Sequence, residues 1–154
     1  MDNWLLLADT SKLGCKEQYR KGTSEVYAVL TFNHNQMFDR IVFFGLQYVI
    51  KKFFERQITK EMIDEFCRVS AIPRTGMSGF NDDLARKRLE SLADLGYLPL
   101  RIRAVTEGSV VGPGNALMTI VNTAPKFHWL VEFVRPVLMN IYRICMIASV
   151  GDRF

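Results

Sequence analysis

Cysteine is scarce in this sequence, and its scarcity argues against two classes of small protein. The chain has three cysteines among 154 residues, Cys15, Cys67 and Cys145, and none of them belongs to a CxxC pair. An odd count at wide spacing argues against a disulfide framework, and the spacing offers no zinc site. Because unpaired cysteines are typical of a reducing compartment, we expect a cytoplasmic protein.

Long apolar runs are also lacking. The run from Trp4 to Leu7 is too short for the core of a signal peptide and follows no basic leader. The longest apolar stretch, around 137–150, is interrupted by Asn140 and Arg143, so it predicts a buried helix and not a membrane span. We therefore expect no membrane partner.

Charge of one sign is not concentrated anywhere. Twenty basic and 16 acidic residues give a net charge of +4, spread over both halves of the chain. The densest basic run, Arg86-Lys87-Arg88, would point to different sides of a helix and so would form no continuous stripe. We therefore expect nucleic-acid binding to be weak and non-specific.

What the sequence does contain is the composition of one globular domain. Apolar residues make up 49% of the chain and charged residues 23%, which excludes disorder as a global description. A chain of this length buries about 70% of its unfolded surface and needs neither a metal nor a disulfide to fold. We predict a single domain over residues 1–154.

The apolar pattern predicts clustered strands and segregated helices. Strands are predicted over 24–32, 98–104, 109–111 and 116–121, and residues 4–8 form either a strand or the start of a helix. Helices are predicted over 37–54, from Thr59 to a break at 71–79, from Asn81 or Asp82 to Gly96, and from Thr123 or Pro125 to Ser149, with a kink or split at Pro136. This order predicts an α+β fold in which a small antiparallel sheet packs with about four helices.

Residues that could carry chemistry are present, but their spacing favours structural roles. They are the carboxylate pairs Asp82-Asp83, Asp64-Glu65 and Asp2/Asp9, the histidines His34 and His128, and the glycines Gly112 and Gly114. The carboxylates suit helix starts and solvated faces, the histidines have no partner at ligand spacing, and the glycines lie between two strands and not before a helix. The pattern predicts no catalytic residue, no metal site and no cofactor site in this chain.

Several longer stretches carry a family resemblance. They are 5–12 (LLLADTSK), 18–27, 44–50 (FGLQYVI), 98–108 (LPLRIRAVTEG), 114–125 and Trp129-Leu130. In this order and spacing they resemble the N-terminal region of nicotinamide phosphoribosyltransferase. The resemblance runs through almost the whole chain, but it covers only the first third or so of the family's chain.

The resemblance implies a function in NAD salvage. The family joins nicotinamide to the ribose of phosphoribosyl pyrophosphate, releasing pyrophosphate and forming nicotinamide mononucleotide, and its members are homodimers with active sites at the interface. The family's catalytic barrel lies C-terminal to the region seen here. Phosphoribosyl transfer needs cations to hold the pyrophosphate and to stabilise the developing charge, so we expect this chain to be inactive by itself and to bind no small-molecule substrate alone.

Three positions near the start bear on substrate binding. Asp9 matches an aspartate that the family's N-terminal region contributes, which makes Asp9 the candidate substrate-binding residue. Ser11 stands where the family has a tyrosine that stacks on the nicotinamide ring of the partner's site, and Cys15 stands where a histidine is common. A hydroxymethyl group cannot stack on a pyridine ring, so the ring-clamping role is weakened.

Two functions remain open at this point. The chain is either an N-terminal-domain homologue that belongs to a split or truncated enzyme, or a non-enzymatic binding or inhibitor protein that acts through the old dimer surface. The last helix is apolar around most of its circumference, which predicts a homo-oligomer, most simply a two-fold dimer, or cover by a protein partner. The predicted interface residues are Phe127, Trp129, Phe133, Val137, Ile141 and Ile144. The alternative is that the rest of the domain wraps this helix completely.

Overall fold

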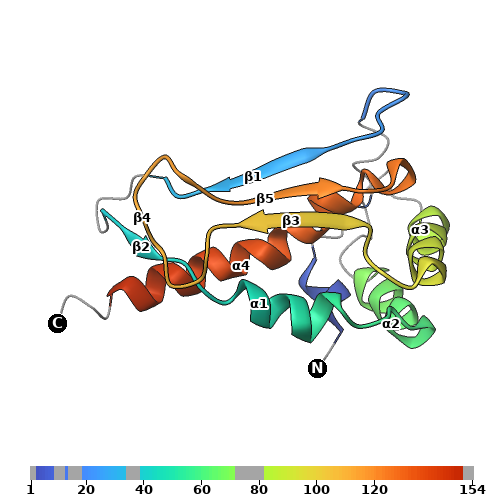
Figure 1. Ribbon diagram of the computed structural model, residues 1–154. Coiled ribbons are helices and arrows are strands. Elements are labelled where there is room, and N and C mark those ends of the chain that lie inside the picture. The colour runs from blue at the N-terminus through green and yellow to red at the C-terminus, as the bar shows by residue number, and fades with distance from the viewer. Residues whose placement is uncertain (1–2, 9–12, 14–18, 34–38, 72–81, 151–154) are drawn as a thin grey trace.

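A computed structural model describes residues 3–8, 13, 19–33, 39–71 and 82–150 (Figure 1). Its main sheet has three strands in the order β1 (Tyr27–Thr31), β5 (Ala116–Asn122) and β3 (Leu100–Ala104), all antiparallel. A separate two-stranded ribbon pairs β2 (Ile41–Val42) with β4 (Val110–Val111). The sheet strands alternate apolar residues toward the core with exposed ones, as a sheet that is covered on one face requires.

Helices cover one face and one end of this sheet. They are α1 (Leu46–Val49), which continues into a π-helical turn η3 (Ile50–Phe54), α2 (Lys60–Ala71), α3 (Asp82–Leu95) and α4 (Leu130–Val150), with 3-10 turns η1 (Trp4–Leu7) and η5 (Pro125–Phe127). Figure 1 shows α4 lying along the sheet, with α2 and α3 together at one end. The predicted α+β fold with a small antiparallel sheet and four α-helices is confirmed.

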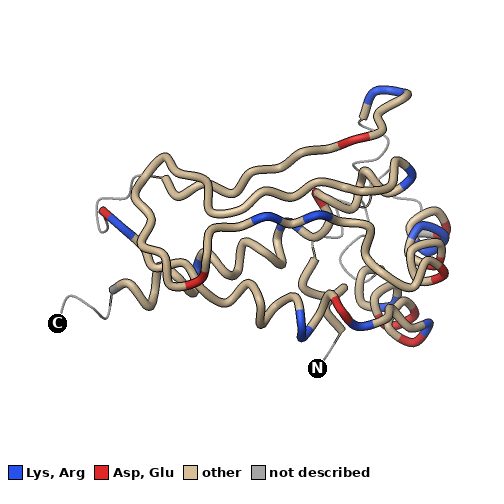
Figure 2. The backbone as a smooth tube through the Cα atoms, viewed as in Figure 1, with Lys and Arg blue, Asp and Glu red and all other residues tan. Residues whose placement is uncertain are grey.

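The core lies between α4 and the sheet. Buried apolar side chains from α4, β5 and β1 meet there, and Trp4, Phe66 and Phe133 extend the core toward η1 and α2. Charged residues lie mainly on the helices and loops (Figure 2). None of the helices in the ranges just given combines the length and the apolar character needed to cross a membrane.

The predicted helix over 37–54 is wrong in its first half. Ile41 and Val42 form strand β2, and α1 begins only after Gly45, whose φ of 94° is the left-handed conformation that favours glycine. The Phe43 N–H donates to the Ser109 carbonyl at 2.9 Å, and the Gly108 N–H donates to the Phe43 carbonyl at 2.8 Å. Pairing with a segment that is distant in sequence therefore overrides the helical spacing of the apolar residues. Residues 37 and 38 lie outside the described ranges.

Other predicted boundaries hold more closely. The Thr59 hydroxyl accepts from the Met62 N–H at 3.3 Å at the start of α2, and Gly96, with a φ of 77°, ends α3. Residues 4–7 form a 3-10 turn and not a strand. Helix α4 is not split at Pro136 but runs through it as one element. The predicted break at 71–79 and the cap at Asn81 fall almost entirely outside the described residues.

Candidate functional site

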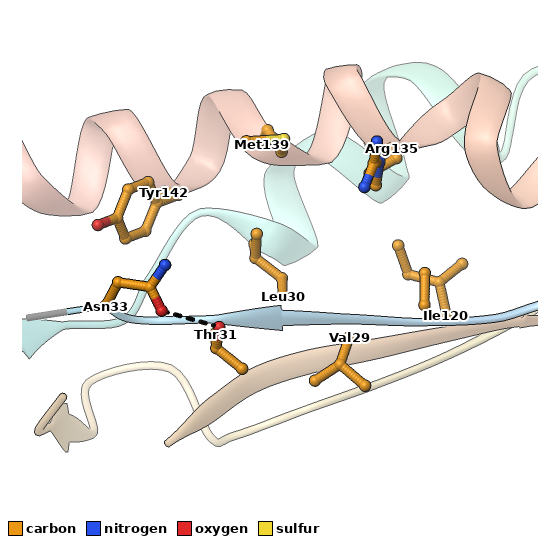
Figure 3. Close-up of a pocket in the computed structure, with 9 residues that line it drawn as sticks. Val29, Leu30, Thr31, Asn33, Ile120, Arg135, Met139 and Tyr142 are labelled. Carbon is orange, nitrogen blue, oxygen red and sulfur yellow. Dashed lines mark hydrogen bonds between the residues drawn. The ribbon is translucent and has the colours of Figure 1, made fainter. Parts of the chain in front are cut away.

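A groove separates edge strand β1 from helix α4 (Figure 3). It has a volume of about 210 Å³ and is lined by Ala28, Val29, Leu30, Thr31, Asn33, Ile120, Arg135, Met139 and Tyr142. Figure 3 shows Leu30 and Tyr142 pointing into the space between strand and helix, whereas Val29 and Thr31 point away from it. The groove is therefore mostly apolar along its length, with polar groups at its two ends. No sequence pattern singled it out, because its two walls lie about a hundred residues apart along the chain.

The second candidate feature is the segment that carries Asp9. Asp9, Ser11 and Cys15 lie outside the described residues, but the chain on either side of residues 9–12 is fixed. On the N-terminal side, the Trp4 ring meets Phe54 edge-on at 5.3 Å and Phe133 at 6.1 Å between ring centroids, and Leu5 is fully buried. The aromatic core therefore holds the start of the chain in place.

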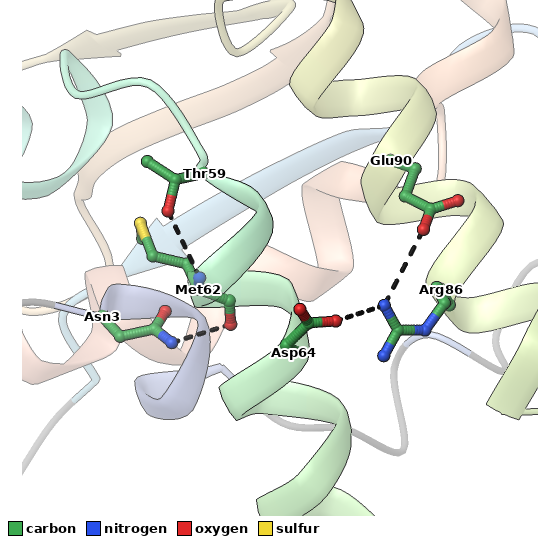
Figure 4. Close-up of polar contacts among 6 residues, drawn as sticks. All are labelled: Asn3, Thr59, Met62, Asp64, Arg86 and Glu90. Atoms are coloured by element: carbon green, nitrogen blue, oxygen red, sulfur yellow. Dashed lines mark hydrogen bonds and ion pairs between the residues drawn. The ribbon is translucent and has the colours of Figure 1, made fainter.

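Asn3 ties the same start to helix α2. Its side-chain amide donates to the Met62 carbonyl (Figure 4) and to a Glu65 carboxylate oxygen, both at 2.9 Å, and its Oδ1 accepts from the Leu5 N–H. This caps the 3-10 turn and links it to a helix that follows more than 50 residues later. The predicted carboxylate pair Asp64-Glu65 is thus engaged in structural contacts.

The C-terminal side of the Asp9 segment is held by helix α3 and by the turn before α4. The carbonyl of the buried Leu13 accepts a hydrogen bond from the Arg88 guanidinium. Farther on, the Tyr19 ring lies edge-on to His128 at 5.2 Å, and the His128 Nδ1 lies 3.0 Å from the Pro125 carbonyl. The described residues on both sides of positions 9–12 are therefore held by the core and by helix α3.

Two stretches that carry the family resemblance meet in the structure. The Glu107 carboxylate accepts from the Gln47 N–H at 2.8 Å, at the N-terminus of α1 where a negative charge is favourable. The neighbouring Phe44 donates its N–H to the Cys145 sulfur of α4 at 3.4 Å, and the Cys145 thiol donates to the Phe44 carbonyl at 3.3 Å. Burial raises the pKa of this thiol. The segments 44–50 and 98–108 thus form one structural junction.

Asn122 is a buried polar residue that sequence reasoning missed. Its Oδ1 accepts from the Val26 N–H at 2.8 Å, and its amide donates to the carbonyls of Ser24 and Ala124 at 2.9 and 3.1 Å. It therefore joins the entrance of β1 to the exit of β5. An asparagine at a strand end shortly before a proline was the available signal.

The remaining chemistry-bearing residues are mostly engaged with one another. Arg86 pairs with Asp64 at 2.5 Å and lies 3.8 Å from Glu90, while Arg88 is buried, so these two members of the basic run face different partners (Figure 4). Within the described ranges, no three His, Cys, Asp or Glu side chains come together as a metal site would require. Residue His34 lies outside those ranges, and Gly114 occupies a turn with a φ of 80°.

The residues of the predicted interface are mostly buried within the chain itself. Phe127, Trp129, Phe133, Val137 and Ile141 are at most 5% exposed and belong to the hydrophobic core. Of the six predicted interface residues, Ile144 is the exposed one, at 49%. The homo-oligomer itself stays a prediction.

The sequence of the chain is similar to those of known proteins. Residues 3–102 match the family model of the nicotinamide phosphoribosyltransferase N-terminal domain. The chain belongs to the nicotinamide phosphoribosyltransferase family. The nicotinamide phosphoribosyltransferase of Xanthomonas campestris pv. campestris (strain 8004) is 33% identical over 151 residues, which are 98% of this chain and 31% of that protein. The nicotinamide phosphoribosyltransferase of Acinetobacter baylyi (strain ATCC 33305 / BD413 / ADP1) is 34% identical, over 88% of this chain and 29% of that protein.

The family's fold is seen in a more distant solved structure. The crystal structure of human nicotinic acid phosphoribosyltransferase matches 92% of this chain with a TM-score of 0.55 at 20% identity, over 25% of that protein. At this identity the match shows the fold alone. The chain thus spans less than a third of the length of these relatives, and the predicted family resemblance is confirmed.

Proposed function

We propose that this chain acts as the N-terminal domain of a nicotinamide phosphoribosyltransferase of NAD salvage, and that alone it forms no nicotinamide mononucleotide. The observation that carries the proposal is the match to that family's N-terminal domain over residues 3–102 in a chain that spans 31% of a full-length relative. In this role Asp9 contributes to the nicotinamide site of a cytoplasmic enzyme.

The burial of the residues that flank Asp9 supports this role. Trp4 and Leu13 are buried on either side of residues 9–12, so this domain holds the chain on both sides of the candidate substrate-binding residue, while the reaction takes place on another part of the enzyme. Ser11 supplies no ring to stack on nicotinamide, so this domain would bind nicotinamide more weakly than a domain with tyrosine at that place.

The first experiment measures activity of the chain alone. Purified chain is incubated with nicotinamide, phosphoribosyl pyrophosphate, Mg²⁺ and ATP, and nicotinamide mononucleotide is quantified, with the full-length Xanthomonas relative as the positive control. We expect no product above the protein-free blank. Turnover that rises in proportion to the amount of chain, and that survives repurification, would overturn the proposed inactivity.

The second experiment tests the domain's role within an enzyme. This chain replaces the matching 151 residues of the Xanthomonas relative, and the chimera is assayed for product. We expect an active chimera in which Ser11→Tyr lowers the KM for nicotinamide about three- to ten-fold, the range that one stacking contact supplies. A chimera that folds as a dimer but has no activity would contradict the proposed role.

A second candidate function is a non-enzymatic binding protein built on this domain. Exposed apolar side chains favour it, since Tyr27 is 62% exposed on β1 and Ile147 is 73% exposed near the end of α4. The chimera separates the two functions, because a binding protein that has lost its enzymatic role would not support catalysis when placed in the relative.

A further inference from the structure

The groove between β1 and α4 carries a single positive charge. Arg135, Met139 and Tyr142 line it from α4 at positions i, i+4 and i+7, so they follow one face of the helix over about 10 Å. Among the nine described residues that line the groove, Arg135 is the only charged one, and none is a carboxylate that could balance it (Figure 3). The groove therefore presents a guanidinium beside apolar walls.

The hydrogen-bonding capacity of Arg135 is not used up within the chain. Its Nη2 lies 3.0 Å from a carboxylate oxygen of Glu132, one turn earlier on the same helix. Its Nε is buried and finds no hydrogen-bond partner among the described residues. A buried donor without an acceptor is costly, and an acceptor in the groove would remove that cost. Because a guanidinium bonds more strongly to an anionic oxygen than to a neutral one, a carboxylate is the best acceptor here.

The size of the groove limits what else a ligand can contain. Its volume of about 210 Å³ lies below the roughly 300–1,000 Å³ of pockets for drug-sized molecules. An α-helix, about 10 Å across with its side chains, is too wide for it. Leu30, Ile120 and Met139 supply apolar walls. The groove therefore suits a small molecule with a short apolar body better than a folded segment of another protein.

We propose that this groove binds a short-chain carboxylate. The carboxylate accepts from the Nε of Arg135, and the alkyl chain lies against Leu30, Ile120 and Met139. The proposal depends on these side chains alone and is independent of the enzymatic role proposed above. Octanoate is a suitable probe, because its extended chain is about as long as the stretch of α4 from Arg135 to Tyr142.

The first test is a titration of the 154-residue chain with octanoate, followed by NMR of the methyl groups of its leucine and methionine residues. We expect saturable shifts of the Leu30 and Met139 methyl signals, with a Kd of about 0.1–1 mM, as a ligand of about ten heavy atoms allows. Octan-1-ol and octylamine have the same apolar body without the negative charge. Each should bind at least about ten-fold more weakly than octanoate.

Two variants test the two parts of the site. Arg135→Gln removes the charged donor and should weaken octanoate binding about ten-fold or more, while leaving the binding of octan-1-ol unchanged. Met139→Trp fills the groove and should abolish the binding of both. Arg143→Gln is the matched control, since Arg143 is an exposed arginine on the same helix that does not line the groove. It makes the same change in net charge and should bind octanoate as the wild type does.

Circular dichroism and the thermal midpoint establish that each variant is folded before it is compared. Loss of octanoate binding in Arg135→Gln but not in Arg143→Gln supports the proposal. The absence of saturable shifts up to about 10 mM octanoate overturns it, as does octan-1-ol binding as tight as octanoate binding. Octanoate binding that survives in Met139→Trp also overturns it, because the ligand would then lie elsewhere.

The chimera with the Xanthomonas relative shows whether the groove stays open in a longer chain. Octanoate binding to the folded chimera, measured by isothermal titration calorimetry, supports the proposal whether or not the chimera forms product. Loss of binding in a folded chimera overturns it, because another part of the chain would then fill the groove. Binding and product formation are separate measurements, so a failure of the proposed function leaves this result unaffected.

Discussion

The two halves of helix α4 have similar apolar content but different surroundings. In the first half, over 130–141, seven apolar side chains are at most 2% exposed: Leu130, Val131, Phe133, Val134, Val137, Leu138 and Ile141. In the second half, over 142–150, Cys145 is buried, while Ile144 and Ile147 are 49% and 73% exposed. The difference teaches that apolar composition alone does not tell which part of a helix is covered by its own chain.

The cause is what lies against each half. The first half meets rings from the start of the chain and from α2, since Phe133 contacts Trp4 and Phe66 at 6.1 Å between ring centroids. The second half is covered on one side by β2 and the start of α1, and Ser149 accepts there from the Val42 N–H at 3.2 Å. The first half of α4 is therefore enclosed by other parts of the chain, and the second half is covered on one side only.

Phe133→Ala should give the largest effect and test the surrounded half. It removes a fully buried ring that also contacts Trp129 at 5.8 Å, so we expect the free energy of unfolding to fall by about 3–5 kcal/mol. Urea denaturation followed by tryptophan fluorescence measures it. Phe133→Leu provides a milder version in case the alanine variant fails to fold.

The control for this change is Met139→Ala on the same helix. Met139 is 42% exposed, so its truncation should alter the free energy of unfolding by less than about 1 kcal/mol. Equal losses for the two alanine variants would mean that the first half of α4 is not the centre of the core.

The two halves of α4 also show which features could be predicted from the sequence. The helical spacing over 130–149, the Thr59 cap and the alternation at 100–104 depend on neighbours within one element, and these predictions hold. Which side of α4 is covered depends on Trp4, more than 120 residues away, and β2 depends on pairing with Val110 and Val111. Contacts of this range leave no local pattern, so the sequence did not show that most of the predicted interface residues are buried in the core, and the helix over 41–45 was predicted wrongly.

The candidate site also combines predictable and unpredictable features. Asp9 could be predicted, because a family resemblance is read from the sequence residue by residue. The β1–α4 groove and the buried Asn122 arise from residues that only the tertiary fold brings together. No periodicity in the sequence could have marked them.

Cys145→Ala should have an intermediate effect and test the stripe that covers the second half. The thiol accepts from the Phe44 N–H and donates to the Phe44 carbonyl, so alanine leaves both groups without their partner. We expect a loss of about 1–3 kcal/mol in the free energy of unfolding. Cys145→Ser keeps a hydroxyl in place and should lose less; a serine variant as unstable as the alanine variant would show that packing and not hydrogen bonding matters here.

Cys145 also predicts a pH dependence. Burial raises the pKa of its thiol, so the folded chain keeps this proton at pH values where the unfolded chain, with an ordinary thiol pKa of about 8.5, has lost it. The stability that this thiol contributes is complete below that pH and decreases as the pH rises above it. Because other groups titrate in this range, the quantity to measure is the difference in unfolding free energy between wild type and Cys145→Ser from pH 7 to pH 10. A difference in unfolding free energy that does not change with pH would contradict the predicted contribution of the Cys145 thiol.

Ile147→Ser should have the smallest effect on folding, and it tests the exposed side of the second half of α4. Ile147 is 73% exposed, so serine removes little buried apolar area, and we expect a change within about 0.5 kcal/mol in urea denaturation. The same variant measures whether this end of α4 contributes to association. If this end of α4 takes part in self-association, Ile147→Ser reduces the concentration dependence of sedimentation, whereas an unchanged dependence would exclude this end of α4 from the contact.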